Sequence, residues 1–482
     1  MKRLTPAASI LLIIALCIAT RLPAMLSPKM LLDPDECVVA LMAKHMWQGK
    51  EFPLFFWGQQ YGFSLIEELF ILPFYSMMGV TAIAVKSAML TLFIIGVIYL
   101  YKALCRINHA NKYVPLILTL LFITVPAWAE WSMKARGGYL TAFTLSSILL
   151  YRLFNKEGNT IWGWILNGVL LAIIYESMIL WFPGMLLFCL YFLIRQTNVT
   201  QATGFILATA IVWVGFHFYT QTLPNFHVPE AYSAPKDWAG HLLRVPTALY
   251  HSLHGNYFFF EIKQVSFLQS FTAYAYCILI LIVLVLSFTA GRRNALLLLT
   301  AIMLLSAILV SVLPPEKHYR YLLPVMGYFL ITLQLLVNKI QIRKVYYGVT
   351  GILMIAGIIS LVQFKEFTYS VVTAQSLKKA VHHLRQHNIY YTFSNDFYLT
   401  WQLNFYANEQ VICRERPYGW RYLPYHQKID AALDSGQPTA LVGLSDDYFG
   451  LNVHGQIYFD YIYVMENMPK SELSKNFGFT YK

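Results

Sequence analysis

The chain has 482 residues, of which 57% are hydrophobic and only 12% are charged. Soluble proteins carry about 25% charged residues, so this composition excludes an ordinary water-soluble protein and predicts one embedded in a membrane. The formal net charge of +12 would fit a nucleic-acid partner if the lysine and arginine residues formed a surface patch. These residues instead lie in alternate loops between hydrophobic stretches, as in a membrane protein, which excludes nucleic acid as a partner.

Hydrophobic stretches that could cross a bilayer recur over the first three quarters of the chain, and each crossing needs about 20 residues. The first follows Lys2 and Arg3 and resembles a signal peptide, but it lacks a clean cleavage site, so we expect an uncleaved membrane helix. Residues 64–78 are expected to insert only halfway. About eleven crossings are predicted, at 7–26, 80–101, 113–129, 138–154, 160–175, 177–194, 203–219, 270–290, 294–313, 322–338 and 345–363.

Lysine and arginine gather in alternate loops, whereas Glu157 is the only acid in those loops. Because cytoplasmic loops are enriched in bases, this bias predicts a cytoplasmic N-terminus and an outer C-terminus. Residues 1–363 then form a transmembrane domain. Its outer loops are 27–79, 129–138, 220–269 and 314–321.

Residues 364–482 are less hydrophobic and are predicted to form a small α/β domain outside the membrane. We expect helices at 375–387 and 427–435 and strands at 389–394, 440–444 and 457–465. No glycine-rich phosphate loop and no nucleophile elbow occurs in it. The domain is therefore expected to support or recognise rather than to catalyse.

The acidic run Asp33-Pro34-Asp35-Glu36 follows the first crossing. Helix capping explains most of it, with Asp33 as N-cap, Pro34 in the first turn and Glu36 as the returning partner of a capping box. Capping leaves Asp35 only a modest benefit from the helix dipole, so Asp35 is the candidate chemical group. The Asp-x-Asp spacing also leaves open a divalent cation held by Asp33 and Asp35.

Two basic clusters flank outer loops. Lys134 and Arg136 precede Gly137-Gly138, a pair of residues that permits close backbone approach to a ligand. The second cluster lies where an outer loop re-enters a helix and comprises Lys317, His318, Tyr319, Arg320 and Tyr321. Both fit a phosphate, which arginine binds with two parallel hydrogen bonds, and both also fit an interfacial anchor. Lys86, inside the second crossing, either reaches the membrane surface or pairs with a buried acid.

Neither the cysteines nor the outer-loop histidines show the spacing of a metal site. The six cysteines contain no CxxC pair, and His251 and His254 have no HExxH motif and no obvious third ligand. None of these cysteines and histidines is therefore predicted to bind a metal ion. A disulfide between Cys37 and Cys413 stays an open alternative if both thiols face an oxidising compartment.

Together, the outer loops offer a carboxylate, several cations and many aromatic side chains at the membrane surface. A carboxylate can accept the proton of an incoming hydroxyl, and cations can stabilise a departing phosphate as its charge develops. Aromatic rings can stack on a sugar. These parts fit transfer of a group from a lipid phosphate.

At several points the chain resembles the GT-C superfamily of polyprenyl-phosphate-sugar glycosyltransferases, in particular the protein O-mannosyltransferase and lipid A aminoarabinose transferase group. The matching segments are Asp35-Glu36, the helix at 40–49, the Gly-Gln-x-Tyr-Gly-x-Ser-Leu-x-Glu-like pattern in 56–67, the KARGGY run at 134–139, the RYLLP run at 320–324 and the tail at 391–416. The resemblance implies that Asp35 is catalytic with Glu36 beside it. Lys134, Arg136, Tyr61, Lys317, His318, Arg320 and Tyr321 are then the candidate substrate-binding residues.

The resemblance further implies a polyprenyl-phosphate sugar donor, a glycan, lipid or protein acceptor, and an active site on the periplasmic face of a bacterial inner membrane. The chain departs from some relatives at Gln59-Gln60-Tyr61-Gly62, where they carry Lys-Pro-Pro, and at Glu130, where they carry an aspartate. A phosphate-binding lysine is thus missing from that loop. A lipid-linked saccharide transporter and a repeat-unit polymerase are the alternative functions.

Overall fold

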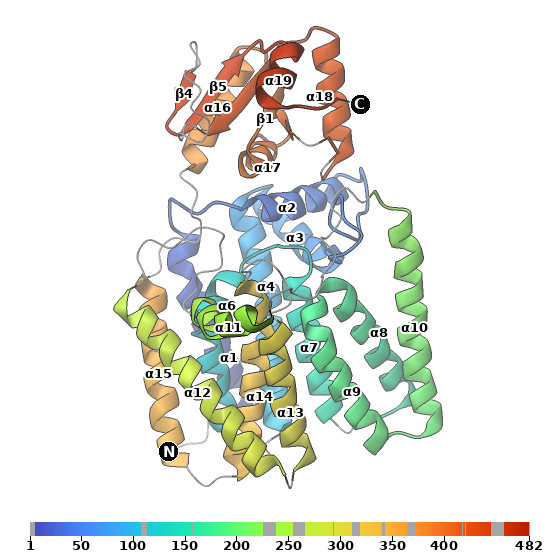
Figure 1. The fold of residues 1–482 in the computed structure, drawn as a ribbon, viewed down its shortest axis with the longest axis vertical. Coiled ribbons are helices and arrows are strands. Elements are labelled where there is room, and N and C mark those ends of the chain that lie inside the picture. Colours follow the sequence, from blue (N-terminus) through green and yellow to red (C-terminus); the bar gives the residue numbers. More distant parts are fainter. Residues whose placement is uncertain are drawn as a thin grey trace.

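The computed structural model describes residues 5–107, 113–155, 159–224, 238–253, 266–292, 294–310, 319–339, 343–363, 372–416, 418–419, 421–444 and 457–481. It is mostly helical, with one small sheet near the C-terminus (Figure 1). The first part contains α1 (Pro6–Met25), α2 (Pro34–Trp47), α3 (Leu65–Met78), α4 (Ala82–Ile107), α5 (Tyr113–Ile123), α6 (Pro126–Trp131), α7 (Tyr139–Phe154), α8 (Ile161–Ser177), η2 (Ile179–Trp181), α9 (Phe182–Gln196), α10 (Val199–Gln221), α11 (Trp238–Leu253), α12 (Phe267–Gly291), α13 (Ala295–Val310), η3 (Tyr319–Leu322), α14 (Leu323–Lys339) and α15 (Arg343–Gln363).

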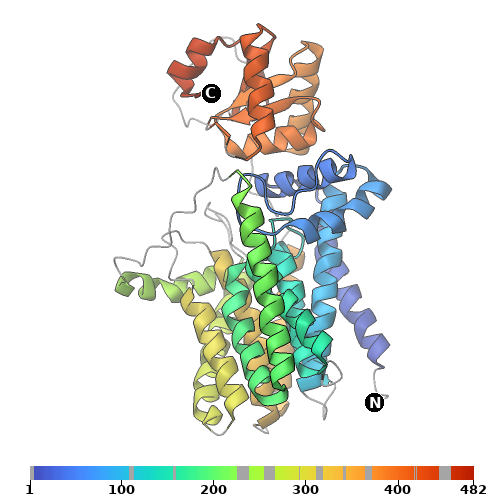
Figure 2. The ribbon, with the colours of Figure 1, turned by 90° about the vertical axis from the view of Figure 1, so that its right-hand side faces the viewer.

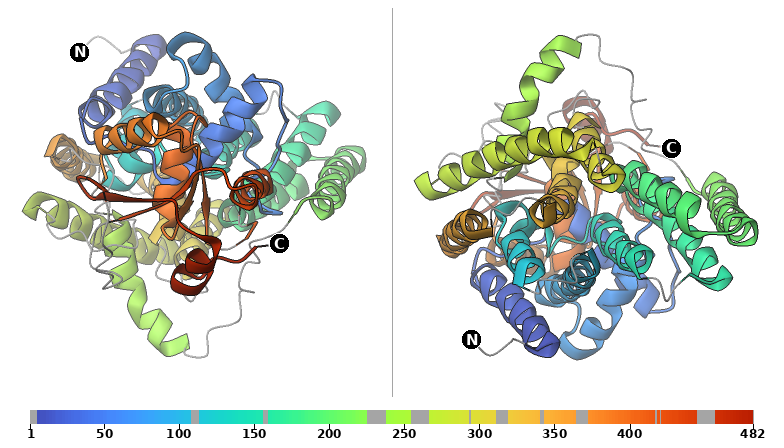
Figure 3. Two further views of the ribbon diagram at one scale, coloured as in Figure 1. Left: turned by 90° about the horizontal axis from the view of Figure 1, so that it is seen from above. Right: turned by 90° about the horizontal axis from the view of Figure 1, so that it is seen from below.

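Each predicted crossing contains a helix. Within the described residues, six helical stretches are long and apolar enough to span a membrane: Pro6–Met25, Ala82–Ile107, Ile179–Gln196, Val199–Gln221, Phe267–Gly291 and Arg320–Asn338. The other apolar helices have 10–17 residues. The chain is therefore a membrane protein, whereas the count of about eleven crossings stays a prediction. The helices run roughly side by side, and the views along the bundle show α10 and α12 at its edge (Figure 3).

Helices α2 and α3 lie at one end of this bundle, where both side views show α2 running across the bundle direction (Figures 1 and 2). The predicted capping box is confirmed. Asp33 accepts a hydrogen bond from the Glu36 backbone N–H (3.1 Å), and Glu36 accepts one from the Asp33 N–H (3.0 Å). Glu36 also binds the Lys86 ammonium of α4, which confirms that Lys86 pairs with a buried acid. This pair joins the start of α2 to a membrane helix.

The C-terminal part holds a five-stranded sheet in the order β2-β1-β3-β5-β4. β1 pairs in parallel with β2 and β3, and β5 pairs antiparallel with β3 and β4. Its elements are α16 (Ala374–Gln386), β1 (Tyr391–Ser394), α17 (Phe397–Tyr406), β2 (Ile412–Glu415), α18 (Leu423–Asp434), β3 (Thr439–Leu444), β4 (Ile457–Phe459), β5 (Ile462–Glu466) and α19 (Lys470–Phe477). It lies at the end of the molecule opposite the start of α1 (Figures 1 and 2).

One sequence prediction in this part was wrong, and one alternative that the sequence left open is excluded. Residues 457–465 form a hairpin and not one strand, because the chain turns at Asp460, whose φ of +55° a short polar side chain tolerates. The Cys37–Cys413 disulfide is absent, since both thiols are free and buried. Cys413 lies in β2 and contacts Thr400 of α17, which places it inside the C-terminal part.

The C-terminal part is held against α2 by helix packing and by a cluster of charges. Helix α17 packs directly on α2. Glu409 forms an ion pair with Lys44, with 2.6 Å between Oε2 and Nζ, and its Oε1 lies 2.7 Å from His45 Nε2. The other ring nitrogen, His45 Nδ1, lies 2.7 Å from Glu51 Oε1. Tyr425 donates a further hydrogen bond to Glu409 (2.7 Å). Both imidazole nitrogens face carboxylates, an arrangement that fits the doubly protonated ring.

This cluster predicts how the stability of the protein depends on pH. Burial alone would raise the pKa of Glu409, but hydrogen bonds from His45 and Lys44 outweigh it, so the pKa lies well below its ordinary 4.5. Burial would lower the pKa of His45, but Glu409 and Glu51 raise it above 6.5. The Glu409 contribution is present above pH 4.5 and is lost as the pH falls towards its folded pKa. The His45 contribution is present below pH 6.5 and is lost as the pH rises through its folded pKa.

We therefore expect the midpoint of thermal unfolding to be highest between about pH 4.5 and 6.5 and to fall on either side. Measured in detergent micelles, the variant His45→Gln should lose the decline on the alkaline side and keep the decline on the acidic side. Parallel pH profiles for the wild type and this variant would contradict the assignment.

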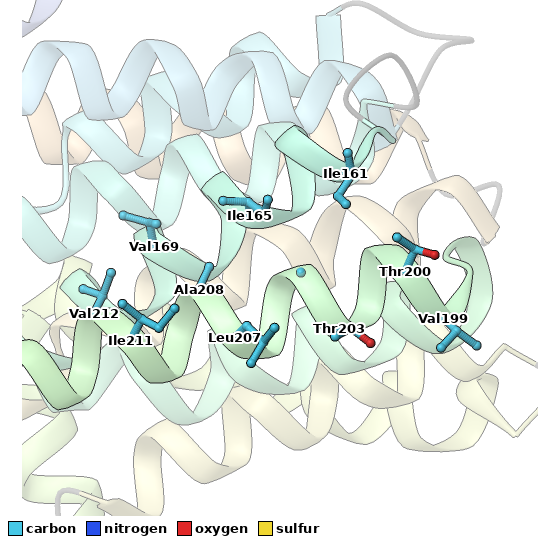
Figure 4. A pocket seen from close by; sticks show the side chains of 11 residues that line it. Ile161, Ile165, Val169, Val199, Thr200, Thr203, Leu207, Ala208, Ile211 and Val212 are labelled. Atoms are coloured by element: carbon cyan, nitrogen blue, oxygen red, sulfur yellow. The ribbon is translucent and has the colours of Figure 1, made fainter.

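An apolar groove lies between α8 and α10 at the edge of the bundle (Figure 4). Its lining side chains are aliphatic or hydroxylic, and none is titratable. They include Ile161, Ile165, Val169, Thr203, Leu207 and Ile211. A groove of this composition offers no acid, base or cation, so we place no chemistry there.

Candidate active site

The loop between α6 and α7, residues 132–138, carries two of the predicted cations. Arg21, near the end of α1, is fully buried and donates a hydrogen bond to the Ser132 hydroxyl (3.1 Å). It also donates to the carbonyl oxygens of Ile123 (2.8 Å) and Trp128 (3.2 Å). A buried guanidinium needs such acceptors, and the carbonyls at helix ends need donors. Arg21 therefore fixes the start of this loop.

The other end of the loop is fixed by Glu67 in the first turn of α3. Its carboxylate accepts hydrogen bonds from the backbone N–H groups of Gly137 (3.0 Å) and Gly138 (2.9 Å). Both glycines have positive φ, +66° and +113°, which a residue with a Cβ adopts only with strain. Burial raises the pKa of Glu67 to about 7, although the two N–H groups act in the opposite direction. The loop is thus tied to α1 and α3.

Asp33 brings both cations of this loop to the start of α2. One of its carboxylate oxygens, Oδ2, lies 2.7 Å from Arg136 Nη2, 3.0 Å from Arg136 Nε and 3.3 Å from Lys134 Nζ. Lys134 also pairs with Glu130 (2.7 Å). Burial alone would raise the pKa of Asp33, but Arg136 and Lys134 outweigh it and hold the pKa well below its usual range. Asp33 is therefore an anionic anchor for two cations.

Asp35 is the accessible carboxylate of the acidic run. Its side chain is 25% exposed, against 5% for Asp33 and 0% for Glu36. Two guanidinium groups lie beside it: Arg136 Nη1 is 3.6 Å from Oδ2, and Arg421 Nη2 is 3.3 Å from Oδ1. A hydroxyl group could thus reach Asp35 from solution, while the two arginines orient its oxygens.

Glu36, which the family resemblance pairs with Asp35 as a catalytic residue, is differently placed. One carboxylate oxygen closes the capping box on the Asp33 N–H, and the other binds the Lys86 ammonium. Its side chain is fully buried. These contacts support a role in positioning α2 and leave no open side for a substrate.

A pair of aromatic rings links the cations to one another. The rings of Trp131 and Tyr139 lie 4.6 Å apart. The Arg136 guanidinium lies 5.4 Å from the Trp131 ring, and Arg320 lies 6.0 Å from the Tyr139 ring. Arg320 Nε is buried and has no hydrogen-bond partner among the described residues. Among the described residues this Nε–H therefore has no acceptor, and a ligand oxygen could accept its hydrogen bond.

The remaining predicted residues of this second cluster divide in two. Tyr321 is buried, and its ring lies 5.5 Å from the Arg320 guanidinium, so it packs beside the candidate cation. Lys317 and His318 lie outside the described residues. The structure therefore places Arg320 and Tyr321 near the site.

The loop between α2 and α3, which contains Tyr61, packs against Gly137 of the α6–α7 loop. Gly62 and Phe63 donate backbone hydrogen bonds to the Glu176 carbonyl oxygen (3.2 and 3.0 Å), and a Cβ on Gly62 would lie 3.1 Å from the Gly137 carbonyl oxygen. Tyr61 itself is 40% exposed. This loop therefore lies beside Gly137, and the Tyr61 side chain is partly exposed.

Comparison with solved structures shows which fold this is. The crystal structure of ArnT from Cupriavidus metallidurans in the apo state matches with a TM-score of 0.52 and 13% identity over 95% of this chain and 98% of that one. The oligosaccharyltransferase of Archaeoglobus fulgidus matches with a TM-score of 0.53 and 9% sequence identity over 92% of this chain and 69% of that one. Arabinofuranosyltransferase AftD from mycobacteria matches with a TM-score of 0.50 and 13% sequence identity over 92% of this chain but only 35% of that one.

This is the fold of the GT-C glycosyltransferases. The fold that the motifs led us to expect is thereby confirmed. No protein-family model matches the chain, and no curated protein matches it either. The structural neighbours are membrane glycosyltransferases, and one of them was solved as ArnT bound to undecaprenyl phosphate.

Within this GT-C fold, three residues near the site were not found from the sequence. Arg421 lies in the C-terminal part, 386 positions from Asp35, which it contacts, so no local pattern signals it. Its guanidinium also lies 4.7 Å from the Phe56 ring. Arg21 and Glu67 are charged residues within apolar segments, and that unusual placement was a usable signal.

The predicted divalent cation at Asp33 and Asp35 stays a prediction, and the contacts do not favour it. A metal ion would need the Asp33 oxygen that Lys134 and Arg136 occupy, and the other Asp33 oxygen caps α2. Two cations beside that oxygen would also repel a metal ion. We therefore derive no step that uses a metal here.

Proposed function

We propose that this protein is a membrane glycosyltransferase that moves a sugar from a polyprenyl-phosphate donor to an acceptor hydroxyl. The observation that carries the proposal is Asp35, the only partly exposed carboxylate of the acidic run, set beside a group of buried cations. A base next to phosphate-binding cations is the minimum that such a transfer needs. The fold supports the same reaction class.

In the proposed reaction, Asp35 accepts the proton of the acceptor hydroxyl while the hydroxyl oxygen forms a bond to the anomeric carbon of the sugar. The bond between that carbon and the phosphate oxygen breaks, and polyprenyl phosphate leaves with the bonding electron pair. Arg136, Lys134 and Arg320 would stabilise the negative charge that develops on the phosphate. Arg136 is suited to this role because it already faces Asp35 and is fixed by Asp33.

A lipid donor is supported by two observations. One structural neighbour, ArnT, was solved with undecaprenyl phosphate. In this chain Lys134 and Arg136 contact Asp33, the N-cap of α2, and α2 lies at one end of the bundle of apolar helices (Figure 1). A donor could keep its prenyl chain in the bilayer and present its phosphate there.

We further propose that the site faces the periplasm of a bacterial inner membrane, with a cytoplasmic N-terminus and a periplasmic C-terminal domain at 364–482. The distribution of lysine and arginine among the loops supports this orientation. The acceptor would be a glycan, a lipid or a protein on that face.

The proposal is tested with purified protein in detergent, a panel of labelled polyprenyl-phosphate sugars, and acceptor membranes from cells that lack the protein. Transfer of single sugars supports the proposal. Growth of a sugar chain would indicate a repeat-unit polymerase instead. Movement of the lipid-linked sugar across vesicles without any bond change would indicate a transporter.

Arg320 provides a test of donor binding. In Arg320→Ala, we expect the apparent KM for the lipid donor to rise roughly 10-fold or more, because a hydrogen bond to a charged group contributes about 1.5–3 kcal/mol. Initial rates at varied donor concentration measure this. Arg195→Ala is a matched control, since Arg195 likewise lies over a tyrosine ring (4.8 Å from Tyr191) but belongs to α9. Equal KM values for the two variants would remove Arg320 from the donor site.

A further inference from the structure

Three side chains converge at one edge of the C-terminal sheet, away from the acidic run. His383 lies in the last turn of α16, His387 is the residue that caps its C-terminus, and Glu466 is the last residue of β5. Glu466 Oε1 lies 2.7 Å from His383 Nε2 and 2.8 Å from His387 Nδ1, and the two imidazole rings are 4.2 Å apart. Their potential ligand atoms all lie within 4.8 Å of one another.

The fold holds these side chains in place from both sides. Helix α16 begins at a capping box on Thr373 and buries Leu377 and Leu384 against the sheet. β5 is paired with β3, where Glu466 lies opposite Ala440. The helix and the strand are therefore both anchored, and residues four apart on a helix share one face. Only the side chains need to adjust when a ligand binds.

The cluster is also accessible. The exposed fractions are 15% for the His383 side chain, 23% for Glu466 and 46% for His387. An ion could thus enter from solution and retain a water molecule. Figure 1 shows α16 and β5 in the C-terminal part, whose α17 is the helix that packs on α2. The cluster shares no residue with the Asp35 site, to which the C-terminal part contributes Arg421.

We propose that His383, His387 and Glu466 bind one divalent transition-metal ion, with zinc as the best match and water as a fourth ligand. Two imidazoles and one carboxylate are a ligand set that zinc accepts, in tetrahedral geometry at about 2.0–2.2 Å from each donor. Donors within 4.8 Å of one another can reach such an ion after side-chain shifts of about 1 Å.

The bound ion would be structural. It would join α16, the first helix of the C-terminal part, to the β4–β5 hairpin at the edge of the sheet. His383 already contacts that hairpin through the Phe459 ring, at 5.2 Å. The competing arrangement is a metal-free one, in which both histidines donate hydrogen bonds to the same Glu466 oxygen. The two arrangements differ in whether the protein binds an ion at all.

The test uses the full-length protein in detergent, purified without a polyhistidine tag and freed of metal with a chelator. Titration with Zn²⁺ should show one equivalent bound per chain, and Co²⁺ should give the visible absorption of a four-coordinate ion. His387→Ala and Glu466→Gln should each weaken Zn²⁺ binding by at least about 100-fold. Loss of a residue that only supports a ligand already costs up to about 100-fold in affinity, and loss of a direct ligand should cost no less. His387 is the most exposed ligand, so its variant should fold.

His382→Ala is the matched control, because His382 lies on the same helix, is exposed and belongs to no such cluster among the described residues. It should bind Zn²⁺ like the wild type. Absence of stoichiometric binding, or equal affinity in His387→Ala and His382→Ala, would overturn the proposal. The readout is metal content and not sugar transfer, so failure of the proposed glycosyltransferase activity would leave this test unaffected.

Discussion

Replacing Asp35 by asparagine should reduce sugar transfer by about 10²–10⁴-fold, the range that loss of a general base produces. Asparagine keeps the shape of the side chain but cannot take the proton of an acceptor hydroxyl. The measurement is the initial rate of transfer at saturating donor. The midpoint of thermal unfolding should barely change, since Asp35 is partly exposed and neither caps α2 nor fills the core.

Two comparisons make this result specific. Asp434→Asn changes an exposed acid of α18 that pairs with Lys470, and it should leave transfer unchanged. Asp33→Asn should lower both activity and stability, because Asp33 caps α2 and holds Lys134 and Arg136. If Asp35→Asn keeps full activity, the proposed mechanism is removed.

The second large effect is on stability and concerns the buried pair of Glu36 and Lys86. In Glu36→Gln the Lys86 ammonium stays buried without its counter-charge, and we expect a loss of about 3–5 kcal/mol in the free energy of unfolding. The capping box at Asp33 should weaken as well, since Glu36 closes it. Unfolding midpoints in detergent, read by circular dichroism, measure the effect.

The double variant Glu36→Gln with Lys86→Met distinguishes a charge effect from a packing effect. Methionine removes the unpaired ammonium and fills a similar volume, so much of the lost stability should return. If the double variant is less stable than Glu36→Gln alone, the pair is not the reason for the loss. If Glu36→Gln is as stable as the wild type, the pair does not hold α2 on α4.

The helices of this protein were largely predictable because their causes are local. A segment in a bilayer must satisfy its own backbone hydrogen bonds, so a run of about 20 apolar residues has few alternatives to a helix. The start of α2 was equally predictable, because a capping box is formed by residues three positions apart. Lys86 was recognisable as exceptional because a charge within an apolar segment needs a partner.

The C-terminal sheet was harder to predict. Strand β2 and helix α17 lack a clear alternating or helical pattern in the sequence and were missed. β2 is buried throughout, and it is fixed by Asn404 of α17, which exchanges hydrogen bonds with the backbone of Cys413. Contacts of this kind exist only after the chain has folded. The hairpin at Asp460 was missed because its turn depends on one residue with positive φ.

The sequence by itself determined that this is a membrane protein with an acidic run at the start of a helix, because hydropathy and helix capping act over a few residues. Only the tertiary structure decided which carboxylate stays accessible. Asp33 pairs with Arg136 and Lys134, and Glu36 pairs with Lys86, and both carboxylates are buried. Asp35 is partly exposed and lies beside Arg421. Those partners are distant in sequence, and only the packing of α1, α3 and α4 with the C-terminal part brings their charges together.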